Sequence, residues 1–192
     1  MRRLHRATGL FPLGAYLAFH AWEHGPVRVG RDALFARLAH TESAPLEIAL
    51  VLVPLVVHAA LGLRLAREPC ADSGYPSPAF RRLQVASGIV AGLFLAHHLV
   101  GVWLPRVTEP SARGAAYDAM LDHVARAPGV AIYAVGLGAV CTHLGQGVGL
   151  ALVRRLPRAP RLARALGVAL GVLLWLTFLD ALAAYATYAP LL

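Results

Sequence analysis

Charge of either sign is scarce in this sequence, and lysine is absent. All 18 basic residues are arginine, there are ten acidic residues, and 58% of the chain is hydrophobic. A water-soluble domain rarely exceeds about half apolar residues. The arginines stand in short clusters between long apolar runs, which is typical of the flanks of membrane spans and not of a nucleic-acid surface. The composition therefore predicts an integral membrane protein that does not bind nucleic acid.

Cysteine is also rare, which excludes several kinds of cofactor site. Cys70 lies between apolar runs and Cys141 lies inside one, so no disulfide framework is indicated. The sequence has no Cys-x-x-Cys-His motif for covalent haem attachment, no cysteine cluster and no dinucleotide fingerprint. The basic N-terminus precedes an apolar run without a small-residue cleavage site, so we interpret it as a retained first helix and not a signal peptide.

Five apolar runs divide the chain, and we expect each to cross the membrane as an α-helix, because none has the two-residue alternation of a barrel strand. The runs are Gly9–His24, Leu46–Leu65, Leu83–Leu104, Val130–Val153 and Ala165–Leu191. About 20 residues cross a bilayer, so the first run is short unless its flanks lie in the interfaces. The connecting segments are short. The sequence thus predicts an all-α membrane protein with one domain over residues 1–192, in which the first four helices form a bundle.

The arginines also predict the orientation of the chain. Twelve lie in the N-terminal tail and in the segments 64–82 and 154–164, which share one side of the membrane. Six lie in the segments 28–37 and 106–126 on the other side, together with most of the acidic residues. Since basic residues favour the cytoplasm, we expect a cytoplasmic N-terminus and an outer C-terminus.

Histidines inside the apolar runs are the strongest functional signal, because ionisable residues at membrane depth are costly and usually functional. His20 and His98 come late in helices that run outward, so both are expected near the outer face. His58 and His143 come late in helices that run inward, so both are expected near the cytoplasmic face. Neutral imidazole is a common axial ligand of haem iron. The four residues therefore predict two b-type haems, each held by a pair of histidines from two helices.

Other interpretations of the histidines stay open at this point. His97 lies beside His98, about 100° away around the helix, and position alone does not choose between them. His20 and His24 share a helix face and could chelate one metal ion, and a single buried histidine is often only an interhelical hydrogen-bonding group. Three more are expected to be solvated, namely His5, His40 and His123. Several glycines near the histidines suit either a porphyrin or close helix packing, namely Gly14, Gly62, Gly88, Gly92, Gly145 and Gly147.

Four stretches of the sequence resemble a known family. They are Arg3-Leu-His5-x-x-Thr8-Gly9 with Pro12 and His20; Leu46-Glu47 with Pro54, His58 and Gly62; Leu83-Gln84 with Ser87-Gly88 and His98; and Tyr133 with His143 and Gly147. This pattern resembles the five-helix, dihaem cytochrome b membrane anchor of succinate dehydrogenases and fumarate reductases that use menaquinone. The resemblance favours His98 over His97 and implies the same two pairs.

What the resemblance implies is a subunit of a respiratory complex in the bacterial cytoplasmic membrane. A partner flavoprotein would handle succinate or fumarate, and a partner iron–sulfur protein would exchange electrons with the two haems and membrane quinone. Arginine-rich cytoplasmic loops are the expected docking face, and three arginines, Arg6, Arg81 and Arg82, are placed to contact the propionates of the inner haem. Another dihaem reductase subunit, or a histidine-dependent metal or proton transporter, is the alternative.

An outer quinone site is expected around the end of the first helix. Relatives use an acidic residue near the first outer loop, so the candidates are Glu23, Glu42 and the neighbouring His24. Some relatives carry a glutamate two residues before the fourth-helix ligand, where this chain has Cys141. Asp180 in the last helix is expected to be a buried acid that pairs with a histidine, with a haem-edge group or with a proton route.

Overall fold

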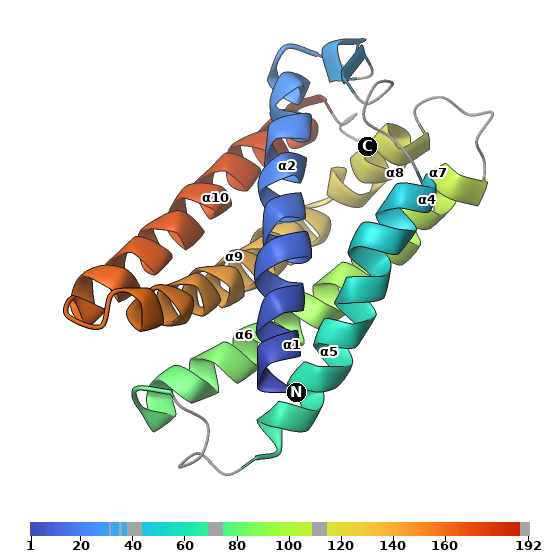
Figure 1. Cartoon of the computed structure of the whole chain (residues 1–192). Coiled ribbons are helices and arrows are strands. Elements are labelled where there is room, and N and C mark those ends of the chain that lie inside the picture. Colours follow the sequence, from blue (N-terminus) through green and yellow to red (C-terminus); the bar gives the residue numbers. More distant parts are fainter. Residues whose placement is uncertain (31, 35, 38–43, 69–74, 109–114, 189–192) are drawn as a thin grey trace.

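A computed structural model describes residues 1–30, 32–34, 36–37, 44–68, 75–108 and 115–188, and the elements within these ranges are helical. The predicted all-helical fold is therefore confirmed. Helical elements follow one another up and down the molecule (Figure 1), so that the N-terminus, the start of the helix Pro78–His98 and the turn after the helix Ala127–Arg155 lie toward one end, called here the near end. The opposite end, called the far end, holds the end of the helix Gly14–His24 and the turn before the helix Ala127–Arg155.

The first helical segment starts earlier than the sequence predicted. It consists of α1 (Arg2–Thr8), a π-helical turn η1 (Gly9–Leu13) and α2 (Gly14–His24), followed by a short 3-10 turn η2 (Gly25–Arg28). At about 1.5 Å per residue, Arg2–His24 is about 35 Å long. The segment is nevertheless less apolar than the four later ones and is not among the helices that qualify as membrane spans by length and composition.

Four later helices are long and apolar enough to cross a membrane among the described residues, at Pro45–Ala66, Pro78–Trp103, Ala127–Arg155 and Pro160–Thr187. They correspond to α4 (Ala44–Glu47) with η3 (Ile48–Leu52) and α5 (Val53–Ala66), to α6 (Pro78–His98) with η5 (Leu99–Trp103), to α9 (Ala127–Arg155) and to α10 (Pro160–Tyr188). Each contains most of a predicted run and extends beyond its start. The chain is a multi-pass membrane protein.

Prolines explain the π-helical turns η1, η3 and η5 of the described residues. Pro12 lies inside η1, Pro54 follows η3 by two residues, and Pro105 follows η5 by two residues in α7 (Leu104–Thr108). Proline has no N–H and cannot complete the hydrogen bond to the residue four positions earlier, so the helix widens locally instead of breaking. The helices therefore pass through their prolines, and His98 directly precedes one of the widened turns.

The far end holds most of the buried core. Side chains from η2, α6, α9, α10 and the short helix α8 (Ala115–Val124) pack there, with Val27, Phe94, Met120, Tyr133 and Leu182 among the buried residues. By contrast, α1 and α5 contain no buried residue. Protein side chains therefore pack less tightly at the near end of the molecule than at the far end.

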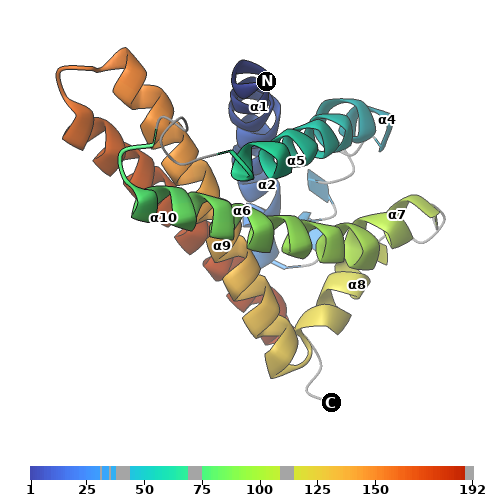
Figure 2. The same ribbon diagram turned by 90° about the horizontal axis from the view of Figure 1, so that it is seen from below.

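Helices α9 and α10 lie side by side in both views (Figure 1 and Figure 2), and glycines allow their close approach. A Cβ added to Gly145 would lie 2.6 Å from the carbonyl oxygen of Gly167, and one added to Gly171 would lie 2.7 Å from that of Cys141. Such small-residue contacts are typical of membrane helix pairs. Gly145 thus belongs to this helix contact.

Candidate functional site

A cavity of about 710 Å³ runs between the helices, within the size range of about 300–1,000 Å³ found for ligand sites. Its wall is mostly apolar and is formed by the first helical segment, α5, α6, α9 and α10. All four predicted haem ligands line it: His20, His58, His98 and His143. His97 is not part of this wall and lies instead at a shallow depression between α6 and α9.

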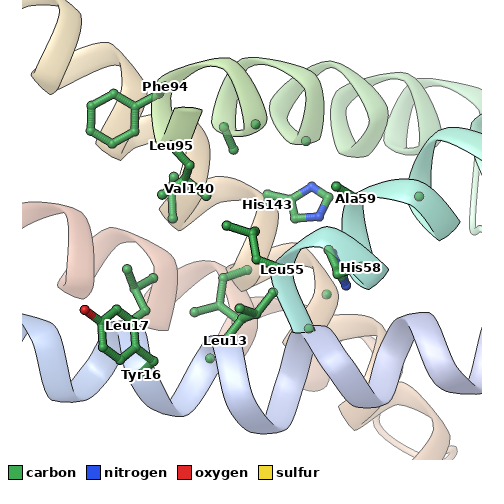
Figure 3. Close-up of a pocket in the computed structure, with 18 of the residues that line it drawn as sticks. Leu13, Tyr16, Leu17, Leu55, His58, Ala59, Phe94, Leu95, Val140 and His143 are labelled. Atoms are coloured by element: carbon green, nitrogen blue, oxygen red, sulfur yellow. The ribbon is translucent and has the colours of Figure 1, made fainter. Parts of the chain in front are cut away.

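The histidines at the near end come from two helices that face each other across the cavity. Figure 3 shows His58 of α5 and His143 of α9 pointing into the same space, with Leu13 and Leu55 beside them. The centres of the two imidazole rings are 6.0 Å apart. Each ring donates its Nδ1–H to a main-chain carbonyl of another helix, over 2.9 Å from His58 to His5 and 3.0 Å from His143 to Gln84.

The histidines at the far end form a second pair with the same spacing. The ring centres of His20 in α2 and His98 in α6 are 6.2 Å apart. Here the Nδ1 atoms contact side chains. That of His20 lies 3.4 Å from a carboxylate oxygen of Glu23, and that of His98 lies 3.2 Å from the hydroxyl of Tyr133.

The ring spacing in both pairs suits one iron between two imidazoles. An imidazole nitrogen lies about 2 Å from a metal that it binds, so two facing nitrogens lie about 4 Å apart and their ring centres about 6 Å apart. Each Nδ1 lies beside an oxygen that can accept its proton, which leaves Nε2 for a metal, and at His143 the side-chain amide of Gln84 lies 3.4 Å from this Nε2. Both pairs therefore have the ring spacing expected of bis-histidine ligation, and each ring has a hydrogen-bond partner at Nδ1, as metal-binding histidines usually do.

Glycines make room for the near-end rings. A Cβ on Gly88 would lie 2.8 Å from Cε1 of His143, and one on Gly9 would lie 2.6 Å from Cε1 of His58. Gly92 and Gly147 line the cavity with no atom within 4 Å of an added Cβ. The buried Oε1 of Gln84, beside His143, has no hydrogen-bond partner among the described residues. An apolar cavity with open glycines fits a large planar group such as haem.

The arginines predicted to contact propionates behave differently from one another. Arg6 and Arg81 line the near end of the cavity, whereas Arg82 is exposed and does not. The guanidinium of Arg81 donates to the carbonyl oxygens of Ala66 and Glu68, and so also caps the end of α5.

Other near-end residues were missed by the sequence analysis. Arg2 and Arg154 line the same part of the cavity, and Tyr75 joins them from the segment before α6. Burial raises the pKa of Tyr75 above its ordinary value, while Arg81 and Arg2 oppose this more weakly. Tyr75 therefore offers a neutral hydroxyl beside the arginines.

The far-end quinone candidates lie in different environments. Glu23 is buried, with 6% of its surface exposed, and His24 donates to or accepts from the hydroxyl of Tyr185 over 2.9 Å. All three residues line the cavity. Tyr185 was not found by sequence analysis, because nothing in its local sequence distinguishes it from a core tyrosine. Glu42 lies outside the described residues.

Several expectations were wrong. Asp180 is not a buried acid: 54% of its side chain is exposed, and it forms an ion pair with Arg28 of η2. His5 is not a solvated flank residue, since its ring stacks on that of His58 with 4.0 Å between centres. His123 packs against His97, with 5.1 Å between ring centres. The helices that carry His5 and His123 turn these side chains toward other helices. The position of a residue outside an apolar run does not show this direction. His40 lies outside the described residues.

A single metal ion held by His20 and His24 finds little support in the geometry. Their rings meet edge to face with 4.3 Å between centres. In the part of the chain that the structure describes, no group of three or more His, Cys, Asp or Glu side chains could hold a metal ion.

Comparison with known proteins gave one informative relative. The chain is similar to the succinate dehydrogenase cytochrome b558 subunit of Bacillus subtilis. The two are 26% identical over 156 residues, which cover 77% of this chain and 75% of the relative. No family model matches the chain, and no solved structure matches it. The similarity confirms the resemblance to a succinate dehydrogenase cytochrome b anchor that the histidine and glycine motifs indicated.

Proposed function

We propose that this chain is the membrane anchor and electron-transfer subunit of a succinate:quinone oxidoreductase. It passes electrons between a partner iron–sulfur subunit and membrane quinone, which we take to be menaquinone. The observation that carries the proposal is the presence of two histidine pairs in one apolar cavity, each from two helices and each with about the ring spacing of bis-histidine ligation. The similarity to a succinate dehydrogenase subunit supports the choice of complex.

In this proposal the near pair, His58 and His143, and the far pair, His20 and His98, hold two b haems. When bound, the haems supply one-electron carriers at two depths of the membrane. The chain's own residues orient the ligands: main-chain carbonyls of His5 and Gln84 accept from the near pair. Leucines of the cavity wall exclude water from both.

The first helical segment completes a five-span topology in the proposed arrangement. His20 and Gly9 lie in it, and its η1 turn packs against α5 and α9. The near end faces the cytoplasm, as the arginine distribution favours. The partner flavoprotein and iron–sulfur subunits then dock at the near end, where Arg2, Arg6 and Arg154 meet the cavity.

We place the quinone site at the far end, around His24 and Tyr185, with Glu42 and Glu23 as the acidic candidates. Two haems at different depths are needed if electrons must cross the bilayer. A single haem would be enough for a quinone site beside the iron–sulfur subunit. Reduction of a quinone needs two protons with two electrons, so titratable groups at the site are required. Each charge that crosses gains or loses about 2.3 kcal/mol per 100 mV of membrane potential.

The test uses the complex purified in mild detergent and placed in proteoliposomes. We expect a flavoprotein and an iron–sulfur protein to co-purify, and we expect succinate-to-quinone activity to fall when an uncoupler collapses the membrane potential. Molybdenum-containing partners would contradict the assignment to succinate oxidation. Activity that does not change when the membrane potential is collapsed would place the quinone site at the near end.

A further inference from the structure

Glu23 lies beside His20, one of the proposed haem ligands. It stands three residues after His20 on α2, a spacing that places two side chains on one helix face. Its carboxylate lies 3.4 Å from Nδ1 of His20, at the long end of hydrogen-bond distances. Only 8% of the Glu23 side chain is exposed.

Other far-end acids have different contacts. Glu47 accepts a hydrogen bond of 2.7 Å from Nε1 of Trp103, and Asp180 pairs with Arg28. The next histidine along the helix, His24, contacts Tyr185 through its Nδ1. Glu23, by contrast, is placed against a histidine of the far pair.

We propose that Glu23 is the positioning residue of His20: its carboxylate accepts the Nδ1–H, turns Nε2 toward the cavity and lowers the redox potential of the iron that His20 binds. The inference rests on the proposed function, since it needs His20 to be a haem ligand. An ionised acceptor increases the electron donation of the imidazole and so stabilises the oxidised iron. Burial strengthens the effect because little water screens the charge.

The contrast with the near pair makes this contact specific. His58 and His143 donate to main-chain carbonyls, and their rings also contact the side chains of Thr8 and Gln84, all of which are uncharged. The far pair therefore includes a ligand with a charged partner, and the near pair serves as an internal reference.

The test is a redox titration of the purified full-length protein with Glu23→Gln. Glutamine keeps an acceptor oxygen and removes the charge. We expect both haems to be retained, one midpoint potential to rise and the other to stay unchanged. A tenfold loss of preference for oxidised iron corresponds to about 59 mV for one electron. Two unchanged potentials would overturn the proposal.

Glu47→Gln is the matched control, because it removes the same charge from a far-end acid that accepts a hydrogen bond from Trp103. We expect a smaller shift than in Glu23→Gln. Equal shifts would mean that charge at a distance, and not contact with His20, sets the potential. If Glu23→Gln lowers quinone turnover while both potentials hold, Glu23 exchanges protons with quinone and the positioning role is wrong.

A second variant covers the case in which Glu23→Gln does not accumulate. Glu23→Asp keeps the charge but shortens the reach to His20, so we expect an altered electron paramagnetic resonance signal for one ferric haem. An unchanged signal for both haems would contradict the proposal. The proposed function fails separately, if the parent protein binds no haem or if His20→Ala retains both.

Discussion

The two ends of the cavity hold similar histidine pairs in different ways. At the near end the predicted ligands donate to main-chain carbonyls of His5 and Gln84, and the side chains of Thr8 and Gln84 also contact their rings. At the far end they contact the side chains of Glu23 and Tyr133. Ring orientation at the near end therefore depends on main-chain carbonyls together with the neutral side chains of Thr8 and Gln84, whereas at the far end it depends on the side chains of Glu23 and Tyr133.

Loss of a ligand is the largest expected effect and separates the two ends. His58→Ala or His143→Ala should remove the near haem, and His20→Ala or His98→Ala the far one, because an iron without its axial donor is no longer held. Absorbance spectra of the purified variants should each show one haem fewer. His97→Ala is the control, since His97 lies outside the cavity. Loss of a haem in that variant together with full occupancy in His98→Ala would reverse the assignment.

The next largest effect on haem content is expected from a substitution that crowds the near pair of histidines. A Cβ on Gly88 would lie 2.8 Å from His143, so Gly88→Ala should displace the ring and lower the content of the near haem. Gly25→Ala is the control, because Gly25 lies outside the cavity wall in helical backbone and its Cβ meets no atom within 4 Å. Pyridine haemochrome assays of both variants measure the difference. Equal haem contents would mean that packing does not hold the near pair.

Arginine variants should have a moderate effect confined to the near end. Arg81 lines the cavity and caps α5, whereas Arg82 is exposed, so Arg81→Ala should shift the near-haem potential and weaken subunit assembly more than Arg82→Ala. Redox titration and co-purification measure the two effects. If Arg81→Ala and Arg82→Ala have equal effects, these arginines contribute only to the orientation of the chain in the membrane.

The smallest effect is expected from Tyr133→Phe, which removes the hydroxyl 3.2 Å from Nδ1 of His98. We expect both haems to remain and only the far-haem potential to move, by less than in Glu23→Gln, because a neutral hydroxyl is a weaker acceptor than a carboxylate. A shift of the near-haem potential instead would contradict the difference between the ends.

Much of this arrangement could be predicted from the sequence, because apolar runs give the position of a residue along the membrane normal. That one coordinate was enough to pair His20 with His98 and His58 with His143. It does not give the direction around each helix, so it left His97 and His98 open and placed His5 in solvent. It also gave no sign of α8, whose ten residues lie in a segment taken as a loop.

The same limit explains the errors at the far end. Asp180 looked buried because apolar residues surround it in sequence, but on α10 it faces Arg28 of a segment 150 residues away. Tyr185 meets His24 for a similar reason. Contacts between distant segments depend on how the helices cross, and the order of residues in one helix does not contain that information.

The haem content of the purified chain tests the central claim most directly. A pyridine haemochrome assay combined with electron paramagnetic resonance should give two non-covalent b haems per chain, both low-spin, because two imidazoles fill the axial positions of each iron. Carbon monoxide should bind little for the same reason. A content of one haem or none, or a high-spin iron at either end, would contradict the account.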